Sequence, residues 1–236
     1  MQPTGMTRVA AIAFSSMVFV ASCRRAKDAT GDIMAESAEI HAQPTNNLFV
    51  ADFQRLVVSS NMTVAATESE VNKLCWKISD LPDRKEAVRL YDQFIEMAIA
   101  QEVTQLNLYH RQNWYSKLWF IAMSAFSFAQ DMRDDTFEAW SRMLRFFGKY
   151  VDEIVAVEKS LPATDWTHWR MSDVRKGEYL MGLKGDFKTS VHVMKDLHFA
   201  KLSKGLTVEQ KADVYRRLDE LNKYTITPTN FPGGKR

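Results

Sequence analysis

The most apolar stretch of the chain is the run over residues 113–130, NWYSKLWFIAMSAFSFAQ. No charged side chain lies between Lys117 and Asp131, and the run holds two tryptophans and three phenylalanines. A helix that is apolar on nearly every side must be surrounded by other helices. A helix that crosses a bilayer needs about 20 apolar residues, so this run is too short to do so. The pattern predicts the central helix of a soluble all-α domain.

The segments on either side of the run carry apolar residues at the three- and four-residue steps of an α-helix. The clearest stripe follows the run and consists of Phe137, Trp140, Leu144, Phe147, Val151 and Ile154. A long helix is expected before it, from about Asp83 past Leu106, with the charged Glu102 as a departure from its apolar face. A first helix is expected to begin near Asn46 or Asn47, after Pro44. The polar cluster over residues 107–113 fits either a turn or a continuous helix.

Further helices are expected in the C-terminal third of the chain. One is capped by Thr164 or Asp165 and ends near Gly182 and Gly185, and a partner helix covers residues 186–202. The last helix is expected to turn five apolar residues inward, namely Val208, Ala212, Tyr215, Leu218 and Leu221.

Short polar motifs mark where several of these helices begin. Thr67 and Glu70, and likewise Thr207 and Gln210, have the spacing of a capping box, in which each side chain bonds a backbone N–H at the helix start. Asp134 or Asp135 is placed to cap the helix with the clearest stripe.

These patterns predict an all-α fold, and they contain no convincing strand. The packing is expected to be either a multi-helix bundle or a short stack of αα-hairpins around the helix at 113–130. The helical domain is predicted over residues 46–224, and a mobile, Pro- and Gly-rich tail over 225–236.

The N-terminus has a different pattern, which predicts a targeting signal over residues 1–22. Arg8 is the only charge before an apolar run over residues 9–22, the arrangement of a secretory signal peptide. The run ends in Val20-Ala21-Ser22-Cys23. This resembles the bacterial lipobox, and the resemblance implies that Cys23 is acylated and becomes the first residue of the mature chain. A plain N-terminal membrane anchor and an ordinary cleaved signal are the alternatives.

The lipobox resemblance places the protein in the bacterial cell envelope. Residues 23–45 would then be the lipidated cysteine and a flexible tether, whose Arg24, Arg25 and Lys27 lie at the membrane surface. The absence of Asp after Cys23 favours the outer over the inner membrane in a bacterium with both, with the domain in the periplasm or at the cell surface. Cys75 then has no disulfide partner and is expected to act as a small buried hydrophobe.

The segment over residues 178–197 resembles the middle of a tetratricopeptide repeat, on the residues Tyr179, Gly182, Gly185, Asp186 and Phe187. The resemblance implies a first helix with Tyr and Gly, a Gly-Asp turn and a second helix that packs back. No 34-residue period recurs, and Thr189 or Ser190 replaces the usual small residue. An unrelated αα-hairpin is the alternative interpretation.

Composition and motifs argue against several common kinds of binding and catalytic site. The formal net charge is only +2, with acids and bases interspersed, which argues against a nucleic-acid partner. The histidines make no pair at metal-ligand spacing, and no nucleotide-binding loop or nucleophile elbow is present. We therefore expect no metal and no cofactor.

The most suggestive side chains lie in the segment 165–170, where an aromatic pocket would use Trp166, His168, Trp169 and Arg170. His110 and Trp114 form a similar mixture of residue types. The alternative to a pocket is that these tryptophans fill the core.

Two functions follow from these expectations. The first is a membrane-anchored envelope lipoprotein with a non-catalytic scaffold or binding domain and a protein partner in the envelope. The second is a hydrolase or ligand-binding protein that uses the aromatic pocket near 166–170. Neither names a ligand or an oligomeric state.

Overall fold

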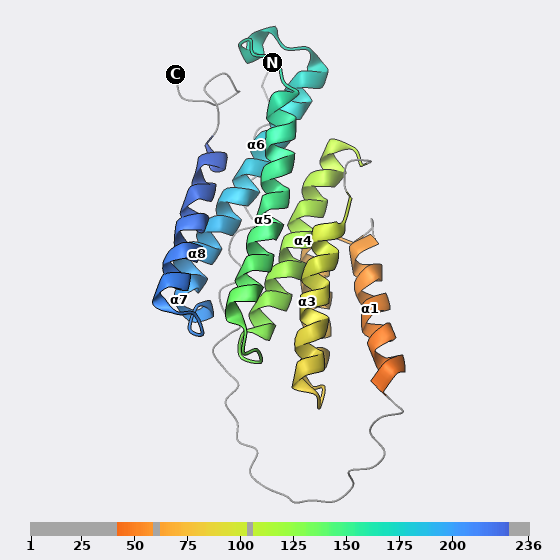
Figure 1. Cartoon of the computed structure of the whole chain (residues 1–236). Coiled ribbons are helices and arrows are strands. Elements are labelled where there is room, and N and C mark those ends of the chain that lie inside the picture. Colours follow the sequence, from red (N-terminus) through yellow and green to blue (C-terminus); the bar gives the residue numbers. More distant parts are fainter. Residues whose placement is uncertain (1–41, 59–61, 103–105, 227–236) are drawn as a thin grey trace, which may run out of the picture. The chain divides into compact units, whose positions relative to one another are not determined.

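The computed structural model describes residues 42–58, 62–102 and 106–226, and these residues form helices and their connections without a strand among them. The long helices alternate in direction along the bundle (Figure 1). The prediction of an all-α, multi-helix bundle is confirmed. The expected signal peptide over 1–22, Cys23 and the tether up to residue 41, and the tail from residue 227 lie outside the described residues.

Helix α4 (Leu108–Ala129) is the centre of the bundle. It packs against α2 (Val64–Ser79), α3 (Arg84–Ala100), α5 (Thr136–Lys159) and α6 (Met171–His192). Its fully buried side chains include Ile121, Ala122, Ala125 and Phe126. The prediction that the apolar run is the central helix is confirmed, because apolar residues around the whole circumference meet neighbours on several sides.

Helix α4 begins before the apolar run, at the start of the polar cluster over residues 107–113, which the sequence left open as a turn or a helix. Asn107 is its N-cap, and the Asn107 side chain accepts a hydrogen bond from the His110 backbone N–H at 3.1 Å. Most of the cluster is therefore helical. Polar residues are favoured at the start of a helix, because their side chains can accept hydrogen bonds from the backbone N–H groups that have no partner within the first turn.

Helix α5 confirms the clearest stripe of the sequence. Asp135 caps it, with its carboxylate accepting from the Glu138 N–H at 3.0 Å. Trp140, Phe147 and Ile154 are fully buried, whereas Phe137 and Val151 are only partly buried. Burial also extends to residues beside the stripe, among them Met143, Phe146 and Tyr150. The buried arc is wider than the stripe because α3, α4 and α6 all pack against α5.

The first three helices differ from their predicted boundaries. Helix α1 (Ala42–Val58) begins before Asn46, so that Pro44 lies in its first turn, where the missing N–H of proline has no helical partner to lose. The predicted capping box at Thr67 is wrong, since Thr63 caps α2 by accepting from the Ala66 N–H. Thr67 is instead buried inside the helix, and its hydroxyl donates to the Thr63 carbonyl at 3.0 Å.

Helix α3 was predicted to run past Leu106 and instead ends at Ala100. The Lys149 ammonium on α5 donates to the carbonyls of Ala98, Ile99 and Gln101, and so satisfies carbonyls that a helix end leaves without partners. A partner from a distant part of the chain ends the helix here, and the local sequence carries no sign of it.

The predicted αα-hairpin over 178–197, and with it the separate helix over 186–202, is wrong. Helix α6 passes through Gly182 and Gly185 without a break. A Cβ on Gly182 would lie 2.6 Å from Nε2 of Gln112, so this glycine allows α6 to approach α4 closely. A glycine inside a helix costs about 1 kcal/mol relative to alanine, and the gain from close packing outweighs that cost here.

The chain after α6 widens into a π-helical segment (Val193–His198) and then continues as α7 (Phe199–Leu202). Helix α8 (Val208–Glu220) begins at the predicted capping box of Thr207 and Gln210, which is confirmed, and leads into a 3₁₀ turn (Leu221–Thr225). The predicted inner face of α8 is mostly wrong. Val214 and Leu218 are fully buried, while Val208 is 78% exposed and Tyr215 is 43% exposed.

Among the described residues, no helix has the length and apolar character that a membrane span requires.

Candidate functional site

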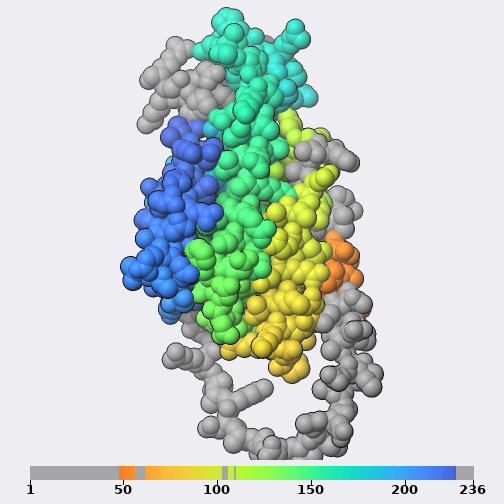
Figure 2. All heavy atoms as spheres, in the orientation of Figure 1, coloured from red at the N-terminus to blue at the C-terminus, as the bar shows by residue number. Residues whose placement is uncertain are grey.

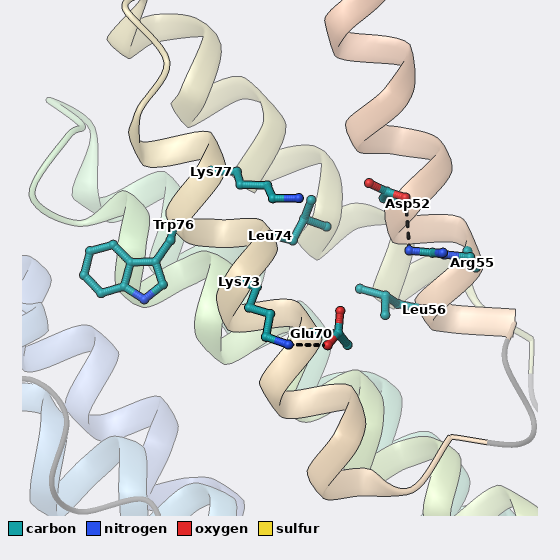
Figure 3. A pocket seen from close by; sticks show the side chains of 8 residues that line it. All are labelled: Asp52, Arg55, Leu56, Glu70, Lys73, Leu74, Trp76 and Lys77. Carbon is teal, nitrogen blue, oxygen red and sulfur yellow. Dashed lines mark hydrogen bonds and ion pairs between the residues drawn. The ribbon is translucent and has the colours of Figure 1, made fainter.

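A surface pocket of about 340 Å³ lies between α1 and α2 (Figure 3). Its lining residues come only from these two helices, and they are Asp52, Arg55, Leu56, Glu70, Lys73, Leu74, Trp76 and Lys77. Leu56 and Leu74 are nearly buried and form the apolar part of the pocket. Cavities that bind small molecules usually have volumes of about 300–1,000 Å³, which puts this pocket at the small end of that range.

Two ion pairs border the pocket, each within one helix. Arg55 Nη2 lies 3.2 Å from Asp52 Oδ1, and Lys73 Nζ lies 2.7 Å from Glu70 Oε1 (Figure 3). The hydrogen bond from Lys73 lowers the pKa of Glu70. Exposed pairs such as these contribute little to folding stability, about 0–1 kcal/mol each. They are therefore available to exchange partners with a charged ligand.

Two further lining residues of the pocket are exposed. Trp76 offers an aromatic ring, and Lys77 offers a cation that forms no ion pair among the described residues. Trp76 is 55% exposed, and its ring points away from α1 and packs edge-on against Phe128 with centroids 4.9 Å apart (Figure 3). Lys77 is exposed on the next position of the same helix. Tryptophan is enriched where proteins bind other proteins, and the neighbouring Lys77 ammonium can attract a partner carboxylate.

The residues predicted to form an aromatic pocket do not line this one. Trp166 and His168 lie on a short 3₁₀ helix (Trp166–His168), and both are exposed, as is Arg170. Trp169 is nearly buried, and its indole N–H donates to the Thr164 carbonyl at 2.8 Å. The two tryptophans thus have different environments, and only Trp169 fills the core. The predicted helix start at Thr164 or Asp165 is wrong, because α6 begins only after both tryptophans, at Met171.

His110 and Trp114 lie together at the start of α4 but away from the pocket. His110 is exposed, with its Nδ1 3.2 Å from the amide nitrogen of Asn107. Trp114 is partly buried, and the Lys117 ammonium lies 6.0 Å from its ring centroid. Neither His110 nor His168 lines the pocket between α1 and α2.

The most polar part of the core is a cluster between α4, α5 and α6. Glu153 is nearly buried and accepts from Arg111 Nη1 at 3.2 Å and from the Tyr179 hydroxyl at 2.9 Å. Burial, followed by the charge of Glu153, raises the pKa of Tyr179. Tyr179 is therefore a neutral phenol that donates to Glu153, and such a hydrogen bond is stronger in the low-dielectric interior than in water.

A second carboxyl, Asp186, belongs to the same part of the core. It accepts from the Ser116 hydroxyl at 3.1 Å. Burial raises the pKa of Asp186, and hydrogen bonds from Ser116 and Gln112 offset part of that rise. Perturbed carboxyls and tyrosines often mark active sites, but they also occur in structural networks. None of these residues lines the pocket between α1 and α2, and we assign the cluster to packing specificity.

Metal binding has no described residues to support it, since no group of three or more His, Cys, Asp and Glu side chains is arranged to hold an ion within the described ranges. Comparison with protein-family models, with curated proteins and with solved structures finds no match to this chain. The site must be interpreted from its own residues.

The sequence analysis missed the pocket between α1 and α2, although its prediction that Cys75 is buried is confirmed. A usable signal was present at Trp76. This residue lies outside the stripe of Leu74, Cys75 and Ile78, and two lysines flank it at Lys73 and Lys77. An aromatic residue on the charged face of a helix is a candidate contact residue rather than a core residue.

Proposed function

We propose that this chain is a lipid-anchored protein of the bacterial cell envelope, acylated at Cys23. The support is the order of residues before that cysteine, with Arg8 ahead of an apolar run and then Val20-Ala21-Ser22-Cys23. The environment of Cys75 adds a second argument. Cys75 is fully buried, and burial raises the pKa of its thiol, so it is a poor partner for a disulfide with Cys23.

We further propose that the helical domain is a non-catalytic binding module for another envelope protein. The observation that carries this proposal is the surface of α2, where exposed Trp76 and Lys77 flank a small pocket bordered by weak ion pairs. The pocket lining contains no histidine, cysteine or serine that could serve as a nucleophile or general base. A partner segment with an apolar side chain next to a carboxylate would fit this combination of side chains.

The anchor is tested by intact-mass spectrometry of the protein purified from membranes of its own bacterium. We expect a chain that begins at Cys23 and carries the mass of a diacylglyceryl group. The variant Cys23→Ser should lack both the lipid mass and the new N-terminus, and Cys75→Ala should keep both. A wild-type chain that begins elsewhere, or that carries no lipid, would contradict the proposal.

The binding surface is tested by placing a photo-crosslinking amino acid at Trp76 in cells of the same bacterium. We expect one discrete crosslinked species, which is lost when Lys77→Glu is added because the charge reversal repels a partner carboxylate. The same crosslinker at Val208, which is also exposed, is the control and should not give that species. Equal crosslinking from both positions, or no effect of Lys77→Glu, would argue against this surface.

A further inference from the structure

The loop between α5 and α6 exposes large apolar side chains at one end of the bundle. Trp166 is 40% exposed, and Met171, the first residue of α6, is 69% exposed. Figure 2 shows the segment in teal at the upper end of the described helices. The exposed apolar area of such a loop is a liability in water unless a second surface covers it.

The loop is held in a defined conformation by its own residues. The Asp165 carboxylate accepts from the Thr167 N–H at 3.0 Å and from the Thr167 hydroxyl at 2.9 Å. A Cβ on Gly177 would lie 2.7 Å from the Trp169 ring, so the indole packs directly against the α6 backbone. Trp169 thus anchors the loop from inside, and Trp166 faces outward. Because the loop is already ordered, little conformational entropy is lost when Trp166 binds a surface.

The exposed charges of this segment are mainly positive. Residues 159–178 expose three cations, Lys159, Arg170 and Arg175, and one carboxylate, Glu178. The other carboxylates have partners: Asp173 pairs with Lys176 at 3.7 Å, Glu158 pairs with Lys184 at 2.6 Å, and Asp165 accepts from the Thr167 N–H.

We propose that this loop docks on an anionic phospholipid surface, with Trp166 and Met171 entering the headgroup region and Arg170 and Arg175 contacting lipid phosphates. Tryptophan favours the membrane–water interface because its ring is apolar and its N–H remains hydrated. Basic side chains near an anionic leaflet add electrostatic attraction that salt weakens. The contact is separate from Cys23, since it uses only residues of the folded domain.

The test uses the full chain with Cys23→Ser and one introduced thiol, because Cys75 is buried. Met171→Cys carries a polarity-sensitive fluorophore, and Val208→Cys on α8 carries the same label as the control. The proteins are mixed with vesicles of phosphatidylcholine and phosphatidylglycerol that contain brominated acyl chains. We expect a blue shift and strong quenching for the label at 171, and an unchanged spectrum for the label at 208. Each label reports only on its own surroundings. Membrane binding through residues 9–22 is common to both labelled proteins and therefore does not account for a difference between positions 171 and 208.

Charge reversal sharpens the test. Arg170→Glu combined with Arg175→Glu should abolish quenching at 171, as should vesicles of phosphatidylcholine alone. Lys85→Glu combined with Lys204→Glu removes the same charge from exposed positions away from the loop and should leave the quenching intact. Circular dichroism checks that every variant keeps its helix content. A label at 171 that stays in water, or quenching that ignores the arginines, overturns the proposal and leaves a protein as the occupant of the loop.

Discussion

Helices α5 and α8 both carry apolar stripes in the sequence, but the stripes are buried to different extents. In α5 most of the predicted stripe belongs to the buried face, with Trp140 and Phe147 fully buried. In α8 the predicted stripe lies to one side of the buried face, and its first member, Val208, is among the most exposed apolar residues of the protein. The two helices differ in what surrounds them.

Helix α5 is packed by α3, α4, α6 and α8, whereas α8 meets α5 together with the π-helical segment and the 3₁₀ turn. A helix with neighbours on several sides buries its whole apolar arc, and any apolar residue in that arc is correctly predicted as core. A helix with neighbours on one side buries only the part that faces them. The periodicity of apolar residues predicts which of them share a helix face, but the packing of neighbouring helices determines which part of that face is buried.

The largest effect should come from truncation in α5. Phe147→Ala should lower the free energy of unfolding by about 3–5 kcal/mol, because it removes a fully buried ring that packs against Trp119 and Phe187. Val208→Ala on α8 should change it by less than about 0.5 kcal/mol. Urea denaturation of both variants measures the difference. Similar losses would mean that Val208 is covered by a contact that the described residues do not include.

Within α8, truncation should locate the buried part of the apolar arc. Leu218→Ala should cost about 2–3 kcal/mol, since Leu218 is fully buried. Tyr215→Ala should cost less than about 1 kcal/mol, because Tyr215 is exposed and its main contacts are the ring of Phe199 and the Lys195 ammonium. The reverse order would show that α8 is rotated relative to the present structure.

Ion pairs extend the comparison to charged residues. Glu153→Gln in α5 should cost about 1–3 kcal/mol, because Arg111 and Tyr179 lose a buried carboxylate acceptor. Asp213→Asn in α8 removes a partner of Arg216 at an exposed position and should cost less than about 1 kcal/mol. Added salt should reduce the effect of the second substitution and leave the first nearly unchanged.

A pH dependence provides a further test at α5. Burial lowers the pKa of Lys149 to about 8 from its ordinary value near 10.5. Between these two pH values the unfolded chain holds the proton and the folded chain has released it, so folding stability gains with rising pH across this window. Wild type compared with Lys149→Met should show this gain between pH 8 and about 10. A stability difference that is flat with pH would contradict the lowered pKa.

Much of the bundle could be predicted because local sequence and tertiary packing agree there. The cap at Asp135, the capping box at Thr207 and the apolar run of α4 each produce their structure from residues close in the chain. Predictions failed where a distant residue decides the outcome. Gly182 was predicted to end a helix, but it lies inside α6, where it allows Gln112 of α4 to approach closely. Helix α3 ends earlier than predicted because the Lys149 ammonium donates hydrogen bonds to its last carbonyls.

For the candidate site, too, features set by nearby residues could be predicted and features set by distant contacts could not. Sequence identified the chemistry of Trp166, Trp169 and Arg170 but not their exposure, because that depends on where α6 begins and on the contact of Trp169 with Gly177. The pocket at α2 escaped prediction because it depends on how α1 packs against α2, which the apolar periodicity of each helix does not specify. Residue type suggests a site, and only the fold decides whether it opens to solvent.

The π-helical segment Val193–His198 has a consequence for how the length of this chain can change. A π turn accommodates one more residue than an α turn while the helix continues in the same direction. Downstream, the Leu202 carbonyl keeps its hydrogen bond from the Trp140 indole at 3.0 Å. Loss of one residue within 193–198 would leave a regular α-helix with Leu202 still in place. Loss of one residue in the middle of α5 would instead rotate all later side chains of that helix by about 100°. Homologous chains of different length should therefore gain or lose a residue at the π segment and keep α5 constant.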